Sequence, residues 1–149
     1  MLRRACIYLG VNFKQAIVTA LHHNSAGISF EQDGPAVIAD WHRAPGLGVA
    51  LRLALERFSP RERNLRDLKK TEWPSYRASS LRSVREFEAA YICISVQALN
   101  EAELFYDAYA YPPGEEDIAL HVTLNRYGPD DVIERKILKL FRACVDWPR

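Results

Sequence analysis

The sequence lacks a long apolar run. No stretch approaches the ~20 consecutive apolar residues that a membrane-spanning helix requires, so we expect no membrane span. Residues 1–15 contain two arginines but only a short apolar segment, which Asn12 and Lys14 interrupt, and this is a poor signal peptide. These features favour a cytoplasmic location.

Cysteine is also scarce, and recognisable ligand patterns are missing. The three cysteines, Cys6, Cys93 and Cys144, lie far apart and form no C-x-x-C pair, which favours free thiols in a reducing compartment. No two histidines have the i, i+4 spacing of a helical zinc site, and the stretch GLGVAL has neither the dinucleotide-binding nor the P-loop pattern. We therefore predict no metal and no cofactor.

Basic residues are missing from one long window. Residues 86–125 contain no lysine or arginine, whereas residues 59–85 are rich in both, although the formal net charge of the whole chain is only +1. We call residues 59–85 the basic arm and expect an exposed, partly irregular connection there. The acids of the basic-free window are Glu86, Glu88, Glu101, Glu103, Asp107, Glu115, Glu116 and Asp117. Electrostatic recognition must therefore arise from this uneven distribution.

The pattern of apolar residues predicts a single α+β domain over residues 1–149. Three segments near the C-terminus, 91–99, 102–111 and 117–125, alternate apolar and polar residues, as half-buried strands do. Their short connections favour a three-stranded antiparallel meander packed by helices, within a mainly antiparallel sheet. We further predict a strand at 4–11, a β-hairpin over 27–41, and helices over 12–22, 44–58, 83–90 and 129–145.

The polar side of the second alternating segment carries carboxylates and aromatic rings. Tyrosine supplies a large contact area with a hydrogen-bonding tip, and carboxylates around it steer a cationic partner. Tyr91 belongs to the same face of the preceding strand. The candidate partner-binding residues are Glu101, Glu103, Phe105, Asp107, Tyr109, Tyr111, Glu115, Glu116 and Asp117. The opposite possibility stays open, namely that a helix or the basic arm of the same chain covers this face.

Two other functions also stay open. A small enzyme could use Cys93 as nucleophile and His121 as general base, because the two residues share the polar side of the sheet. An RNA-binding adaptor could use residues 61–85, where Trp73 and Tyr76 alternate with basic residues. The acids in the basic arm and the small net charge argue against the adaptor, so we expect no direct nucleic-acid binding.

Residues 69–106 carry a family resemblance. A Trp-Pro pair precedes RASSLRSVREFE, and a β segment and NEAEL follow. Together with APGLGVALRLAL and LFRACVD, this block resembles immunity proteins of bacterial contact-dependent growth-inhibition loci. The resemblance implies a cytoplasmic, non-enzymatic protein that binds and neutralises the C-terminal domain of a cognate exported toxin. Many such toxins are nucleases that attack transfer RNA through a basic cleft, which the acidic face could fill.

Overall fold

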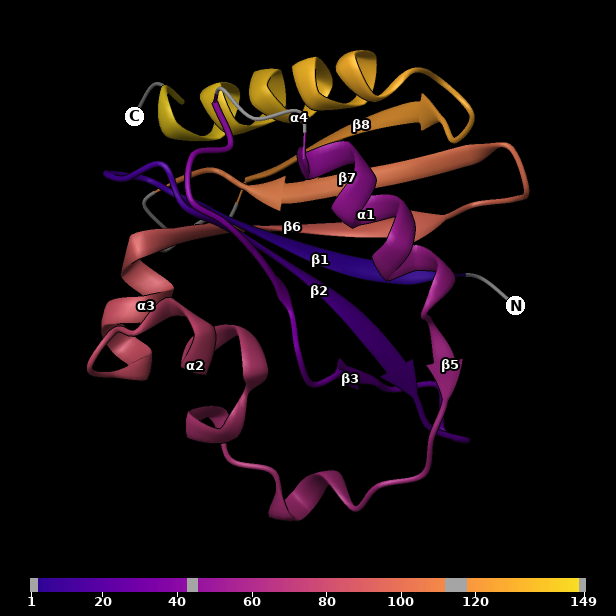
Figure 1. Ribbon diagram of the computed structural model, residues 1–149, viewed down its shortest axis with the longest axis vertical. Helices are drawn as coiled ribbons and strands as arrows, with labels where there is room; N and C mark the ends of the chain where they lie inside the picture. The colour runs from indigo at the N-terminus through magenta and orange to yellow at the C-terminus, as the bar shows by residue number, and fades with distance from the viewer. Residues whose placement is uncertain (1–2, 43–45, 112–117, 148–149) are drawn as a thin grey trace.

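The computed structural model describes residues 3–42, 46–111 and 118–147, and within them eight strands form one mainly antiparallel sheet (Figure 1). The strands pair in the order β3-β2-β1-β6-β7-β8, and β4 and β5 also pair with β2. Their bounds are β1 Arg4–Gly10, β2 Ala16–His23, β3 Ser29–Glu31, β4 Ala36–Ile38, β5 Ser59–Pro60, β6 Tyr91–Ala98, β7 Glu103–Tyr109 and β8 Ala119–Asn125. The α-helices are α1 Gly46–Glu56, α2 Pro74–Ser79, α3 Val84–Ala90 and α4 Asp130–Val145, and two short 3-10 helices are η1 Leu65–Asp67 and η2 Lys70–Glu72. The predicted α+β class is confirmed.

Helices α1 and α4 cover one face of the sheet. The main hydrophobic core lies there, where side chains such as Ile7 and Ile94 of the sheet meet Leu51 of α1 and Ile137 of α4. Helix α1 packs on β2 and β1, and α4 packs on β8 and β7 and contacts α1, whereas Figure 1 shows α2 and α3 well separated from both. We call this the helix-covered face and the opposite side of the sheet the outward face.

The outward face is covered only in part. Tyr8 and Ile17 form a second, smaller hydrophobic cluster there with Phe87 of α3 and with Tyr91. The side chain of Tyr91 therefore lies on the predicted face but is buried against α3, with 5% of its surface exposed. Helix α3 thus covers the outward face near the start of β6.

The predicted helix over residues 12–22 is wrong, because the structure has β2 there. Helices or strands cover β2 on both sides, so its residues from Ala16 to Leu21 are all buried. A strand buried on both faces shows a continuous apolar run without alternation, and this run resembles a buried helix. The β-branched residues Ile17, Val18 and Thr19 favour the strand.

The hairpin over residues 27–41 is also wrong, although its two strands exist. Strands β3 and β4 do not pair with each other; both pair antiparallel with β2, end to end. Residues 32–35 lie between β3 and β4 and oppose only the two residues Thr19 and Ala20 of β2. The segment is therefore one edge strand that a bulge of extra residues interrupts. Gly34 has the positive φ (70°) that the sequence predicts, but it serves this interruption and not a hairpin turn.

The C-terminal half agrees with prediction. Strands β6, β7 and β8 form the antiparallel meander, and α4 buries its predicted apolar stripe on the sheet. Ser83 begins α3, since its Oγ accepts a hydrogen bond from the Glu86 amide at 3.1 Å. The Glu86 carboxylate in turn accepts a hydrogen bond from the Arg82 amide, just before the helix.

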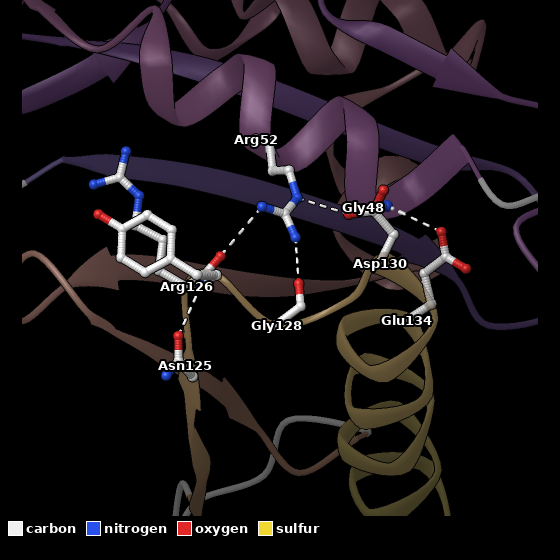
Figure 2. A network of polar contacts seen from close by, with 8 residues as sticks. Gly48, Arg52, Asn125, Arg126, Gly128, Asp130 and Glu134 are labelled. Carbon is white, nitrogen blue, oxygen red and sulfur yellow. Dashed lines mark hydrogen bonds and ion pairs between the residues drawn. The ribbon is translucent and has the colours of Figure 1, made fainter.

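A polar network fixes the end of β8 against both helices (Figure 2). Arg52 of α1 donates to the Asp130 carboxylate at 2.6 Å and to the backbone carbonyls of Arg126 and Gly128. Nearby, the Gly48 amide donates to Glu134 of α4 at 3.2 Å. A Cβ atom at Gly48 would lie 3.1 Å from Cβ of Asp130, which is tighter than ordinary contact, so a larger residue there would push the two helices apart. The network holds β8, and with it the outward face of the meander, in a fixed position.

Candidate functional site

Beyond the parts that α3 and the basic arm border, the outward face of β7 and β8 is accessible, and the side chains across β6, β7 and β8 are arranged in rows. Ser95 lies opposite Asp107, and Asp107 lies opposite His121. Directly opposed residues in a sheet point to the same side, so this row continues through Cys6 of β1, which pairs with Ser95. His121 is exposed and Asp107 is half-buried.

Four of the predicted partner-binding residues lie together on β7. Glu103 and Tyr109 are exposed, the latter with 57% of its surface accessible, and Phe105 and Asp107 are half-buried. The ring of Phe105 contacts the imidazole of His121, with 5.2 Å between the ring centres. Glu101 is exposed in the turn before β7. The structure therefore brings acids and aromatic rings onto one accessible surface.

Tyr111 lies elsewhere. Strand β7 ends at Tyr109, and Tyr111 is half-buried and packs against the main hydrophobic core, with its hydroxyl donating to the Ala89 carbonyl at 2.8 Å. The sequence-based placement of this ring beside Tyr109 is wrong, because the regular alternation stops where the strand does. Glu115, Glu116 and Asp117 lie outside the described residues.

Asp107 has an unusual position for a carboxylate. Within the described residues its side chain has no hydrogen-bond donor and no ion-pair partner, although it is half-buried. By contrast, Glu103 accepts a hydrogen bond from the Asn100 side chain at 3.0 Å. The oxygen atoms of Asp107 are therefore available as acceptors for solvent or for a cationic ligand.

An open cavity of about 580 Å³ adjoins Asp107 on the outward face. Its polar lining includes Cys6, Tyr8, Ser29, Glu31, Gln97 and Asp107, and its apolar lining includes Leu65, Leu68 and Trp73 from the basic arm. The cavity therefore lies between the sheet and the basic arm. Its residues come from five strands, β1, β2, β3, β6 and β7, and from the arm, which are distant in sequence.

Glu31 is held rigidly at one side of this cavity. Its carboxylate accepts hydrogen bonds from the Tyr8 hydroxyl at 2.7 Å and from the Ser75 amide and hydroxyl at 2.9 and 2.7 Å. Burial, and then the charges of Cys93 and Glu31 nearby, raise the pKa of Tyr8, so this hydroxyl keeps its proton and acts as a donor. All three donors are neutral, and no cation of the described ranges forms an ion pair with Glu31.

Two hydroxyl groups on the outward side of the sheet, one of them at the cavity lining, are buried and have no partner among the described residues. Oγ of Ser29, a lining residue, and Oγ1 of Thr19 have no hydrogen-bond partner within the described residues. Thr19 is completely buried and lies opposite Cys6 in the sheet, so it points to the cavity side. Buried polar atoms without partners are rare in folded proteins and mark places where a ligand or water completes the hydrogen bonding.

The geometry does not favour the Cys93–His121 pair. Cys93 is on β6 and His121 on β8, with β7 between them, and Ser95 rather than Cys93 shares the row of His121, so the two are at least about 10 Å apart at a strand spacing of about 4.8 Å. A general base must lie within hydrogen-bond reach of its nucleophile. Cys93 instead neighbours Cys6: a hydrogen bond to Cys93 and burial raise the pKa of the Cys6 thiol.

The aromatic residues of the basic arm face their own chain. Trp73 is half-buried and lines the cavity, and Tyr76 packs edge-on against Phe87, with 5.9 Å between the ring centres. Lys70 pairs with Glu88 at 3.0 Å and lies over the Trp73 ring at 5.5 Å. These rings are therefore poorly placed to stack on bases, which leaves the adaptor hypothesis without a stacking surface.

The described ranges offer neither a metal centre nor a membrane-spanning helix. No group of three or more histidine, cysteine or acidic side chains there could hold a metal ion. None of the helices in those ranges combines the length and apolarity that a bilayer crossing requires.

Sequence reasoning missed the cavity. Strand alternation places Ser95 and Gln97 on the outward face, but no local pattern brings Glu31 or Trp73 to the same place. Glu31 reaches the cavity through the pairing of β3 with β2, and Trp73 through the packing of the basic arm against the sheet.

Comparison with known proteins identifies the fold but not the activity. No protein-family model matches the chain, and no curated protein matches it. The chain is similar in structure to NMB0488 from Neisseria meningitidis, a protein of unknown function, with a TM-score of 0.71 and 13% sequence identity. The similarity covers 97% of this chain and 96% of that one. At this identity the likeness shows a common fold alone, so function has to be argued from the surface described above.

Proposed function

We propose that the protein is an immunity protein that binds and neutralises the toxin domain of a contact-dependent growth-inhibition system, with the outward face of β7 as part of its binding surface. One observation carries the proposal: Asp107, a half-buried carboxylate without a partner within the described residues, lies beside the exposed ring of Tyr109 on an open sheet surface. The resemblance of residues 69–106 to immunity proteins points the same way.

The chemistry of this surface fits a basic protein partner, and a nuclease that binds the phosphates of transfer RNA has such a surface. Glu101 and Glu103 are exposed and would raise the rate of encounter with a basic cleft. Tyr109 would supply buried contact area at the centre, since tyrosine is enriched among residues that dominate binding energy. Neutralisation by tight binding needs no catalytic group on this chain.

Growth protection tests the proposal. The toxin domain encoded in the reading frame directly upstream is expressed in cells with and without this chain, and the two proteins are then purified together. We expect the chain to restore growth and to form a stable complex with the toxin domain. Unchanged growth arrest, with both proteins folded and present, would overturn the proposal.

Association kinetics test the role of charge. Glu103→Gln should slow association severalfold and reduce its dependence on salt, because exposed acids act mainly on the encounter rate. Asp146→Asn is the matched control, since Asp146 is also exposed but follows α4, which covers the other face of the sheet. Equal effects of the two variants would argue against binding through β7.

A further inference from the structure

We infer that the open cavity between the sheet and the basic arm is a binding site for a guanidinium group on an apolar stem. An arginine side chain of the toxin domain supplies that group; this choice of source rests on the proposed function. The cavity, of about 580 Å³, is large enough for a complete arginine side chain.

The charge of the cavity favours a cation. Asp107 and Glu31 both line it, and neither has an ion-pair partner within the described residues. Arg4 is the cationic side chain of the lining, and it lies opposite Gln97, whereas Asp107 lies opposite Ser95. Two carboxylates therefore face one guanidinium, and a second cation would complete the charge balance.

The hydrogen-bonding groups favour a ligand with several donors. The Asp107 carboxylate, the Gln97 side-chain carbonyl and the unpaired Ser29 hydroxyl are acceptors at the lining. Thr19 adds a completely buried, unpaired hydroxyl on the same side of the sheet. A guanidinium has five N–H donors in a planar fork, whereas a lysine ammonium has three at one point, so arginine matches this spread of acceptors better.

The walls favour an apolar stem. Leu65, Leu68 and Trp73 of the basic arm form one side of the cavity, and Leu21 contributes from the sheet. Arginine buries its methylene groups along apolar surface while its charged end reaches polar partners. A small inorganic cation would leave this apolar surface uncovered.

Binding of n-butylguanidinium, a guanidinium on a four-carbon stem, tests the inference without any toxin. Titration into the labelled protein is followed by amide chemical shifts in NMR spectra. We expect saturable binding in the millimolar range, which suits so small a ligand, with shifts concentrated at Gln97, Ser75 and Trp73. n-Butanol, which has the stem without the charge, should bind at least about tenfold more weakly.

Two variants locate the site. Asp107→Asn, which keeps the shape and removes the charge, should weaken n-butylguanidinium binding about tenfold. Asp146→Asn, a carboxylate change remote from the cavity, should leave binding unchanged. Equal binding of n-butanol, equal affinity of Asp107→Asn and the unchanged protein, or shifts spread evenly over the surface would each overturn the inference.

The two proposals fail in different ways. A chain that protects cells from the toxin but does not bind n-butylguanidinium overturns the cavity assignment alone. A chain that binds n-butylguanidinium through Asp107 but does not neutralise the toxin overturns the proposed function, and the cavity then serves another guanidinium-bearing ligand.

Discussion

Removal of one buried hydroxyl should stabilise the protein. Tyr106 of β7 is completely buried in the main core, and its hydroxyl has no hydrogen-bond partner within the described residues. Burial raises the pKa of this phenol, and the charge of Arg52 lowers it, so the group stays neutral at physiological pH. Tyr106→Phe keeps the ring and removes only the oxygen atom.

The expected gain follows from the desolvation of the hydroxyl. A buried polar group without a partner is unfavourable by about 1–3 kcal/mol, so Tyr106→Phe should raise the free energy of unfolding by at least about 1 kcal/mol. For a chain of this length, that corresponds to a rise in Tm of about 2–4 °C. Denaturant unfolding followed by circular dichroism measures the change, provided that the m-value stays constant.

Tyr8→Phe is the matched control, with an effect of opposite sign. The Tyr8 hydroxyl donates to the Glu31 carboxylate at 2.7 Å. A hydrogen bond to a charged group contributes about 1.5–3 kcal/mol, so the same chemical change should here lower the free energy of unfolding by about 2 kcal/mol. A loss of stability in Tyr106→Phe equal to that in Tyr8→Phe would refute the reasoning, because it would mean that the Tyr106 hydroxyl has a partner.

Three further predictions concern packing, thiol access and pH. Gly48→Ala should lower the free energy of unfolding by about 1–3 kcal/mol in thermal denaturation, because the added Cβ would lie 3.1 Å from Cβ of Asp130, the first residue of α4. Gly46→Ala is the control and should not lower it, because a Cβ there meets only ordinary contact with Ile38 at 3.9 Å. Iodoacetamide should label exposed Cys93 in the native protein and buried Cys144 only after unfolding, since burial raises the pKa of Cys144 to about 11. Mass spectrometry of the labelled peptides would show the order, and labelling of Cys144 in the native protein would contradict the prediction. Burial lowers the pKa of His22 below its usual 6.5, so the unfolded chain binds the proton more readily than the folded one. The free energy of unfolding should therefore fall as the pH drops through about 6.5, and His22→Gln should reduce this fall in denaturant titrations. An unchanged dependence of stability on pH in His22→Gln would contradict the prediction.

The sequence predicts the C-terminal half of the fold well because each element there has one buried side. Ile94 and Val96 alternate with exposed Cys93 and Ser95, and Ile137 repeats with Leu140 and Cys144 along α4. Such periodicity reports directly which side of an element meets the core. The central strand β2 defeats the same method, since partners cover both of its sides and no alternation remains.

The candidate binding surface likewise has a part that the sequence predicts and a part that it does not. The outward position of Phe105, Asp107 and Tyr109 follows from strand alternation alone, and that part of the prediction needs only local information. The burial of Tyr91 under α3 and the departure of Tyr111 from the strand depend on where other elements pack. The cavity could not be predicted from local patterns at all, because the β2–β3 pairing brings Glu31 to it and the path of the basic arm brings Trp73.

The central claim is that the outward face of β7 binds the toxin domain, and the affinity of the complex tests it most directly. Tyr109→Ala and Tyr127→Ala remove two exposed tyrosines, 57% and 69% accessible, of which only Tyr109 lies on that face. Isothermal titration should show that Tyr109→Ala weakens binding by about 2 kcal/mol, roughly thirtyfold in Kd, while Tyr127→Ala leaves it unchanged. Unchanged affinity of Tyr109→Ala, with both variants folded, would contradict the account.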